Sequence, residues 1–172
     1  MKKIVFVIAV LFLAFTCMAC GNPYIGKIVK KDMTRKLETP SGKNHHYVLN
    51  HIIVDYSYTR YPAQQMMLLQ GTIDDRQQDA QAHLVQDSNW TLKEAYLDIY
   101  LLNSERRVVD YCRKGFPPGH FAFPYPFKAK CRYSPDYIYT APAYFYKYIQ
   151  YEGGSSEVVK IYEHRLDIEP GQ

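Results

Sequence analysis

The strict alternation of side chains along residues 121–133 constrains the fold of this chain more than any other feature of its sequence. In FAFPYPFKAKCRY, aromatic and small residues fall at every second position, and proline, lysine and arginine stand at most of the positions between them. A period of two is typical of a strand with one buried and one solvated face. The two prolines lack the N–H that a ladder needs, so at least the first half of this strand is expected at a sheet edge or outside the sheet.

The same pattern recurs in most of the chain after residue 45. The stretch LKEAYLDIYLLNSERRVVDYC predicts a hairpin that turns at NSER, although its leucine, lysine, glutamate and alanine residues also suit a helix. Residues 74–89 are polar and predict the longest loop, with one or two helical turns in its middle. Gly71 predicts a bulge or close packing within its strand. Further strands are expected in HIIVDYSY, QMMLLQGTID, IYTAPAYFYKYIQYE and EVVKIYEHRLDI.

About seven strands with hardly a helix predict an all-β domain of two antiparallel sheets packed face to face. Within it, YLDIYLLNSERRVV (residues 96–109) resembles the middle of small immunoglobulin-like domains of bacterial envelope proteins, the FxLYD-type group. In that group an apolar strand turns and re-enters as valines. The resemblance implies an immunoglobulin-like sandwich, here in residues 45–172, and a role in adhesion or assembly.

The first twenty residues have the three parts of an export signal. Lys2 and Lys3 form a positive start, residues 4–15 are apolar, and small residues follow near a cleavage point. The apolar run is shorter than the roughly 20 residues that span a bilayer. A retained signal-anchor helix is therefore the second interpretation.

The end of this segment, in which Cys17, Met18, Ala19 and Cys20 precede Gly21, resembles the lipobox of bacterial lipoproteins. Ala19 and Cys20 match the family pattern, whereas Cys17 and Met18 stand where the family prefers leucine and a small residue. The resemblance implies that residues 1–19 are a signal peptide and that Cys20 becomes the acylated first residue. One acyl chain holds a protein at a membrane only marginally, so stable anchoring needs two or more. A plain secreted protein cleaved near Ala19 is the alternative.

The resemblance also implies a location in the cell envelope. Gly21 at the position after the cysteine favours the outer membrane, facing the periplasm, if the cell is Gram-negative. We expect residues 20–44 to be a tether that connects the anchor to the domain. Its basic residues are suited to contact with anionic lipid head groups.

Export places the remaining cysteines in an oxidising compartment. With Cys17 removed and Cys20 acylated, Cys112 and Cys131 are an even pair, and we predict a disulfide between them. Closing a loop of this size stabilises the fold by about 3 kcal/mol, mainly by constraining the unfolded chain. Two buried free thiols are the alternative.

The charge of the chain gives no reason to expect a nucleic-acid partner. The formal net charge is +4, and removal of Lys2 and Lys3 lowers it to +2. The lysines and arginines are also scattered rather than clustered in one stretch.

The sequence contains no recognisable catalytic motif. His45, His46 and His51 are close together, but their spacing fits no closed metal site, and on a strand His45 and His51 would lie about 20 Å apart. Asp110 has no predictable acidic partner. We therefore predict no catalytic residue, no metal and no cofactor.

Tyrosine is the unusual component of the composition, with 17 Tyr and 8 Phe against one Trp. Tyr144, Tyr146 and Tyr148 share one face of a strand, and Phe145 lies on the other face. One interpretation is that the three tyrosines form an exposed surface that binds a protein, a glycan or a lipid head group. The other is that their rings are buried at the rim of the sheet.

These observations together predict a lipid-anchored envelope lipoprotein with a non-catalytic binding or assembly domain. Its expected partners are the membrane, through acyl chains on Cys20, and an envelope protein or glycan. The alternative is a lipid-anchored hydrolase or carbohydrate-active enzyme. That enzyme would show a pocket with converging ionisable groups.

Overall fold

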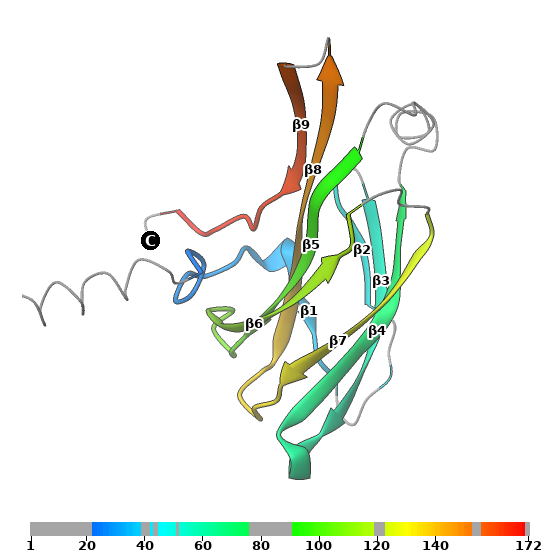
Figure 1. The fold of residues 1–172 in the computed structure, drawn as a ribbon. Coiled ribbons are helices and arrows are strands. Elements are labelled where there is room, and N and C mark those ends of the chain that lie inside the picture. Colours follow the sequence, from blue (N-terminus) through cyan, green and yellow to red (C-terminus); the bar gives the residue numbers. More distant parts are fainter. Residues whose placement is uncertain are drawn as a thin grey trace, which may run out of the picture.

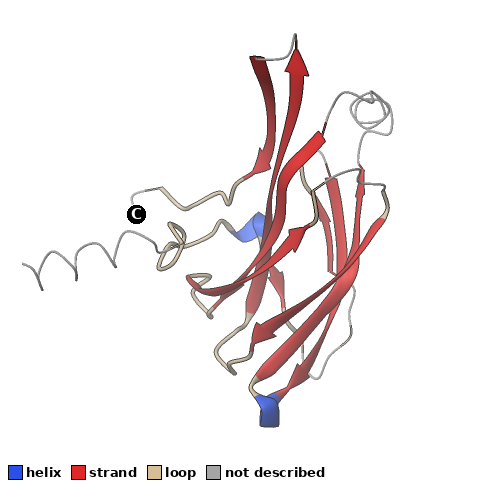
Figure 2. Ribbon diagram, viewed as in Figure 1, coloured by secondary structure: helices blue, strands red, loops and turns tan. Residues whose placement is uncertain are grey.

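The protein folds as a β-sandwich of two antiparallel sheets, as the alternation of its sequence predicts (Figures 1 and 2). The computed structural model describes residues 22–38, 42, 45–50, 52–75, 91–118, 123–152 and 156–170. Nine strands lie in these ranges, two more than the sequence suggested, because two short strands, β1 and β2, precede the first long one.

The first sheet is built around the two longest strands of the protein, β5 and β8. Its order is β1-β8-β5-β6, and β9 pairs with β8 on the same side as β1 but farther along the strand. The strands are β1 (Arg35–Lys36), β5 (Thr91–Leu102), β6 (Val108–Phe116), β8 (Tyr139–Glu152) and β9 (Ser156–His164).

The second sheet has the order β2-β3-β4-β7. Its strands are β2 (His45–Val48), β3 (Ile52–Tyr61), β4 (Met66–Asp75) and β7 (Tyr125–Arg132), and a 3-10 turn, η3 (Pro62–Gln64), joins β3 to β4. Strand β7, which contains Pro126, lies at the edge of this sheet, as its prolines predicted.

The order of the central strands is that of an immunoglobulin sandwich. In that fold strands B and E are neighbours in one sheet, and strands C and F are neighbours in the other. Here β4 and β7 take the places of strands B and E and lie side by side. Strands β5 and β8 take the places of C and F and also lie side by side. The hairpin predicted from residues 92–112 is present as β5 and β6, so the helical alternative for this stretch is wrong.

The core between the sheets consists of the alternate residues that the sequence assigned to one face. On β3 these are Ile52, Val54, Tyr56 and Tyr58, all almost inaccessible to solvent. Gly71 of β4 packs closely, as expected, because a Cβ atom at this position would overlap the carbonyl oxygen of Asp55.

The disulfide predicted between Cys112 and Cys131 is present and joins the two sheets. Cys112 lies on the edge strand β6, and Cys131 lies on the edge strand β7. Their Cα atoms are 5.4 Å apart, inside the range that an unstrained bridge requires. The bond therefore closes one side of the sandwich.

Residues 22–38 are part of the folded body, so the expectation of a tether over residues 20–44 is wrong for this part. Figure 1 shows this segment and the segment after β9 lying together on the side of the first sheet that faces away from the second sheet. A second apolar cluster forms there, in which Val29 and Leu166 from the terminal segments cover Tyr100, Leu102 and Ala141. The segments also pair with each other through an isolated bridge between Val29 and Ile168.

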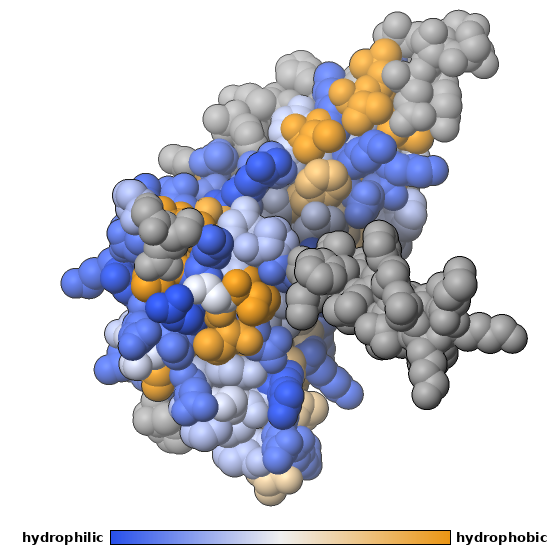
Figure 3. All heavy atoms as spheres, turned by 90° about the vertical axis from the view of Figure 1, so that its left-hand side faces the viewer, coloured by the Kyte–Doolittle hydropathy of each residue, from blue (hydrophilic) through white to orange (hydrophobic). Residues whose placement is uncertain are grey.

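The hairpin of β8 and β9 extends beyond the rest of the sandwich (Figure 1). Val159 and Ile161 of β9 are 42% and 55% exposed. Figure 3 shows hydrophobic residues gathered near this end of the molecule. The polar segment 76–90 and residues 119–122 lie outside the described residues.

Candidate functional site

Tyr144, Tyr146 and Tyr148 do not form an exposed face. Their side chains point into the core between the sheets, and Tyr144 is only 2% exposed. The structure corrects the binding interpretation and shows why both faces of β8 carry rings. One face packs on the second sheet, and part of the other is covered by the terminal segments, so both faces of this strand are buried over part of its length.

The histidines lie in different environments. His46 is exposed and its Nδ1 lies 2.7 Å from Oδ1 of Asp55, whereas His45 is buried in the core. His51 lies outside the described residues. Over the part of the chain that the structure describes, no three metal-ligating side chains come together.

His45 belongs to a buried polar cluster that connects the sheets. The hydroxyl of Tyr56 donates to Oγ1 of Thr140 over 2.7 Å, and that oxygen lies 3.2 Å from Nδ1 of His45. The hydroxyl of Tyr47 donates to the carbonyl oxygen of Thr140 over 2.8 Å. Burial raises the pKa of Tyr47 to about 12 and lowers the pKa of His45 to about 4. All of these side chains are therefore neutral at pH 7, and their hydrogen bonds hold the two sheets together within the core.

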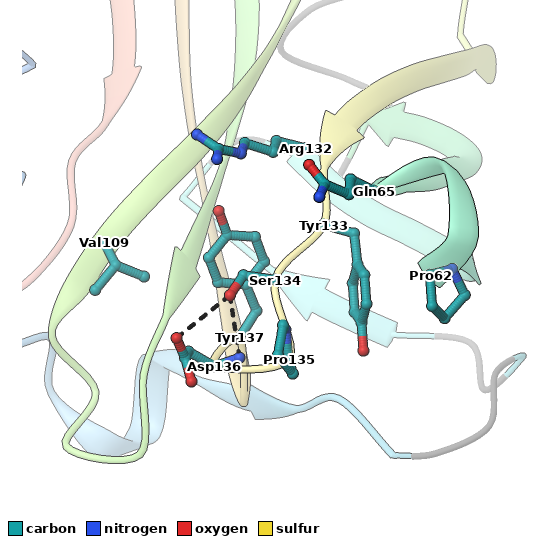
Figure 4. Close-up of a pocket in the computed structure, with 9 residues that line it drawn as sticks. All are labelled: Pro62, Gln65, Val109, Arg132, Tyr133, Ser134, Pro135, Asp136 and Tyr137. Atoms are coloured by element: carbon teal, nitrogen blue, oxygen red, sulfur yellow. Dashed lines mark hydrogen bonds between the residues drawn. The ribbon is translucent and has the colours of Figure 1, made fainter.

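A wide, open hollow lies beside the turn that follows β7 (Figure 4). Its volume is about 610 Å³, and Arg132 and Gln65 lie on its upper side in the view. Its polar groups are largely engaged in local structure: Asp136 and Ser134 are hydrogen-bonded to each other within the turn. Tyr137 donates to Asp110, the acid considered from the sequence, over 2.8 Å.

A second hollow, on the outer face of the first sheet, combines buried charge with aromatic walls. We call it the Ala143 pocket; its volume is about 460 Å³. It forms because β9 ends at His164, next to Tyr144, so no strand continues beside Ala143. The small side chain at position 143 leaves room for a hollow. The residues around it come from β5, β6, β8, the end of β9 and the N-terminal segment.

The central polar group of the Ala143 pocket is Asp98, which lies opposite Ala143 in the sheet. Its side chain is 4% exposed, and both carboxylate oxygens accept hydrogen bonds from Arg113, each over 2.8 Å. Arg113 lies on β6, and its side chain is 48% exposed. The hydrogen bond to Asp98 raises the pKa of Arg113. This bidentate geometry is the strongest form of a carboxylate–guanidinium pair.

A second ion pair stands at the end of β9. Arg165 donates to Glu163 over 2.8 Å, and this bond raises the pKa of Arg165. His164 lies between them in sequence, and burial lowers its pKa, so the imidazole is neutral at pH 7. The ionised side chains of the pocket are therefore two carboxylates and two guanidinium groups, whose charges sum to zero.

Aromatic rings form the walls of the pocket. Tyr96 and Phe145 are stacked with their centroids 5.2 Å apart, and the guanidinium of Arg113 lies 3.9 Å from the centroid of Tyr96. Tyr24 meets Tyr100 edge to face at 5.3 Å. Burial raises the pKa of Tyr24, Tyr96 and Tyr100, so their hydroxyls stay protonated and able to donate hydrogen bonds.

The N-terminal segment completes the pocket. Nδ2 of Asn22 donates to the hydroxyl of Tyr100 over 3.1 Å, and its Oδ1 accepts from the backbone N–H of Tyr24 over 3.0 Å. Asn22 therefore fixes the start of the described chain to the sheet. Cys20, the predicted lipidation site, lies outside the described residues.

Sequence reasoning missed this site. Asp98 interrupts the apolar run AYLDIYLL, and a carboxylate in a buried strand requires a partner. That signal pointed to a basic residue on a neighbouring strand. Asn22 and Tyr24 were missed because the segment that contains them was assigned to the tether.

No protein-family model matches the chain, and no curated protein or solved structure is similar to it at a significant level. Among the described residues there is no helix long and apolar enough to cross a membrane.

Proposed function

We propose that this protein is a lipid-anchored lipoprotein of the bacterial cell envelope and that its β-sandwich is a non-catalytic binding or assembly module. The lipobox-like sequence that ends at Cys20 supports the anchor. The Cys112–Cys131 disulfide is in keeping with an exported protein, because such bonds persist in oxidising compartments.

The lipobox-like sequence carries this proposal, and the docking of Asn22 on Tyr100 indicates where an anchor at Cys20 would join the domain. Asn22 is two residues after Cys20, and two residues span at most about 7 Å. An acylated Cys20 would therefore hold the outer face of the first sheet close to the membrane. The Ala143 pocket opens on that face, so a ligand or partner at the membrane surface would meet it directly.

The alternative is a lipid-anchored hydrolase. The Ala143 pocket does contain two carboxylates, Asp98 and Glu163, but each is already bound by an arginine. A general acid or base must be available to exchange a proton with the substrate. The pairing of both carboxylates therefore favours binding over hydrolysis.

Mass spectrometry of the N-terminal peptide from membrane-extracted protein tests the anchor. We expect a peptide that begins at Cys20 and carries the mass of a diacylglycerol and an N-acyl chain. The variant Cys20→Ala is expected to lose both the modification and membrane association. The matched variant Cys17→Ala should retain both. A peptide that begins with an unmodified Gly21 would contradict the proposal.

A further inference from the structure

We propose that the Ala143 pocket binds an uncharged saccharide. The proposal deepens the binding role inferred above by naming the ligand class. It does not require the acyl anchor.

The charges of the pocket disfavour an ion as the ligand. Asp98 is paired with Arg113, and Glu163 is paired with Arg165. His164 is neutral at pH 7 because burial lowers its pKa. An anion would meet two carboxylates, and a cation would meet two guanidinium groups. An uncharged ligand avoids the repulsion between like charges that either ion would meet.

The groups at the pocket match the hydroxyls of a sugar ring. The carboxylate of Glu163 accepts hydrogen bonds, and the guanidinium groups of Arg113 and Arg165 donate them. The carboxylate of Asp98 is almost inaccessible to solvent and holds Arg113 in place. Both members of Glu163–Arg165 are partly exposed, so their remaining hydrogen-bonding capacity can face a ligand. Each sugar hydroxyl both donates and accepts, and paired groups of this kind satisfy both functions.

The walls and size of the pocket match the apolar face of a sugar. Arg113 lies over the ring of Tyr96, and Phe145 stacks on Tyr96 from the neighbouring strand. Phe145 therefore supplies the aromatic wall on the same side of the sheet as Ala143, and sugar C–H groups pack on aromatic rings. A volume of about 460 Å³ lies within the range of ligand pockets, about 300–1,000 Å³. The combination of a few polar groups with aromatic walls is typical of such sites.

Methyl NMR of the full-length protein, labelled with ¹³C at alanine methyls, tests the proposal. The protein is kept in a detergent without a sugar head group and titrated with glucose, galactose, N-acetylglucosamine and their disaccharides. We expect at least one sugar to shift the Ala143 methyl signal to saturation. The signal of Ala129, which lies on β7 in the other sheet, should not move. The response should change little with salt, because the ligand is uncharged.

Two variants tie the response to the pocket. Arg165→Ala removes a largely exposed donor and should weaken binding about tenfold or more. Ala143→Leu fills the hollow and should abolish binding, and a melting curve shows that the variant folds. Because this variant lacks the Ala143 methyl, binding is followed through the Ala141 methyl. Arg132→Ala removes an exposed arginine beside the other hollow and should bind as the parent does.

The source of the saccharide is resolved by a second arm in which nanodiscs carry a glycolipid. A stronger shift there than with the free sugar would identify a membrane-borne glycan, and a stronger shift with the free sugar would identify a soluble one. The proposal is overturned if no sugar in either arm moves the Ala143 signal. Phosphate and glycine are titrated in the same way as charged probes, and a shift with either of them but with no sugar also overturns the proposal. Neither result depends on whether Cys20 is acylated, so failure here and failure of the anchor are distinguishable.

Discussion

At the scale of single residues, two buried polar side chains are held by partners on other strands. Asp98 is held by Arg113, and Thr140 is held by tyrosine hydroxyls from the opposite sheet. A buried polar group that loses its partner costs about 1–3 kcal/mol, and a charged group costs more. These pairings therefore fix how the strands align as well as how tightly they pack.

His45 makes the stability of the fold depend on pH. Its pKa is lowered to about 4, first by burial and then by the charge of Arg35. In the unfolded chain His45 binds a proton below about pH 6.5, whereas in the folded chain it stays neutral down to about pH 4. Above pH 6.5 this difference does not affect the free energy of unfolding. The free energy of unfolding falls by up to about 3 kcal/mol as the pH drops to 4.

Urea unfolding of the protein between pH 7.5 and 4 measures this effect. We expect His45→Gln to flatten the dependence, because glutamine takes up no proton in the unfolded state. His164 contributes with the same sign, since burial also lowers its pKa, so some slope should remain. His46→Gln, a change at the exposed neighbour, is the control. A parent slope equal to that of His45→Gln would contradict the prediction.

At the scale of elements, the disulfide is the covalent link between two edge strands, β6 and β7. Edge strands have fewer backbone partners than central strands, so they open first. Tying one edge of each sheet together restrains that opening.

Replacing both Cys112 and Cys131 with alanine should lower the free energy of unfolding by about 3 kcal/mol. Amide exchange should accelerate more in β6 and β7 than in the central strand β5. Reduction of the parent protein should reproduce the loss. An exchange pattern that changes equally in every strand would contradict the role assigned to the bond.

The elements also show how far the sequence can predict this structure. Alternation predicted β3, β7 and the β5–β6 hairpin, because a half-buried strand records its two faces in every second residue. It left two interpretations open for the face of β8 that carries Tyr144, because both faces carry rings and alternation does not say which of them meets the core. It could not reveal the Ala143 pocket, which depends on where β9 stops and on which segment lies over the sheet.

At the scale of the whole molecule, the sandwich has a third, partial layer made by the two terminal segments. Val29 is completely buried in this layer, beneath which lie Leu102 and Ala141. The backbone N–H of Glu169 donates to the carbonyl oxygen of Ile28 over 2.9 Å. The layer therefore depends on contact between the two ends of the described chain.

Val29→Asp should disrupt this layer and lower stability by about 3–5 kcal/mol, because it places an unpaired charge in an apolar cluster. Brief trypsin treatment should then cut the variant near Lys30 while the parent stays intact. Ile25→Asp is the matched control, since Ile25 is exposed on the same segment. Equally rapid cleavage of the parent at Lys30 would show that the segment is a free tether.

The pairing of the terminal segments also decides where a reporter can be attached. Because Val29 pairs with Ile168, a fluorescent protein fused at the C-terminus would emerge on the side of the sheet that carries Asn22 and the Ala143 pocket. It would compete for space with the ligand proposed for the pocket and with the membrane to which we propose that Cys20 is anchored. A small tag in the β3–β4 turn, at exposed Gln64, is attached to the other sheet and leaves this layer undisturbed.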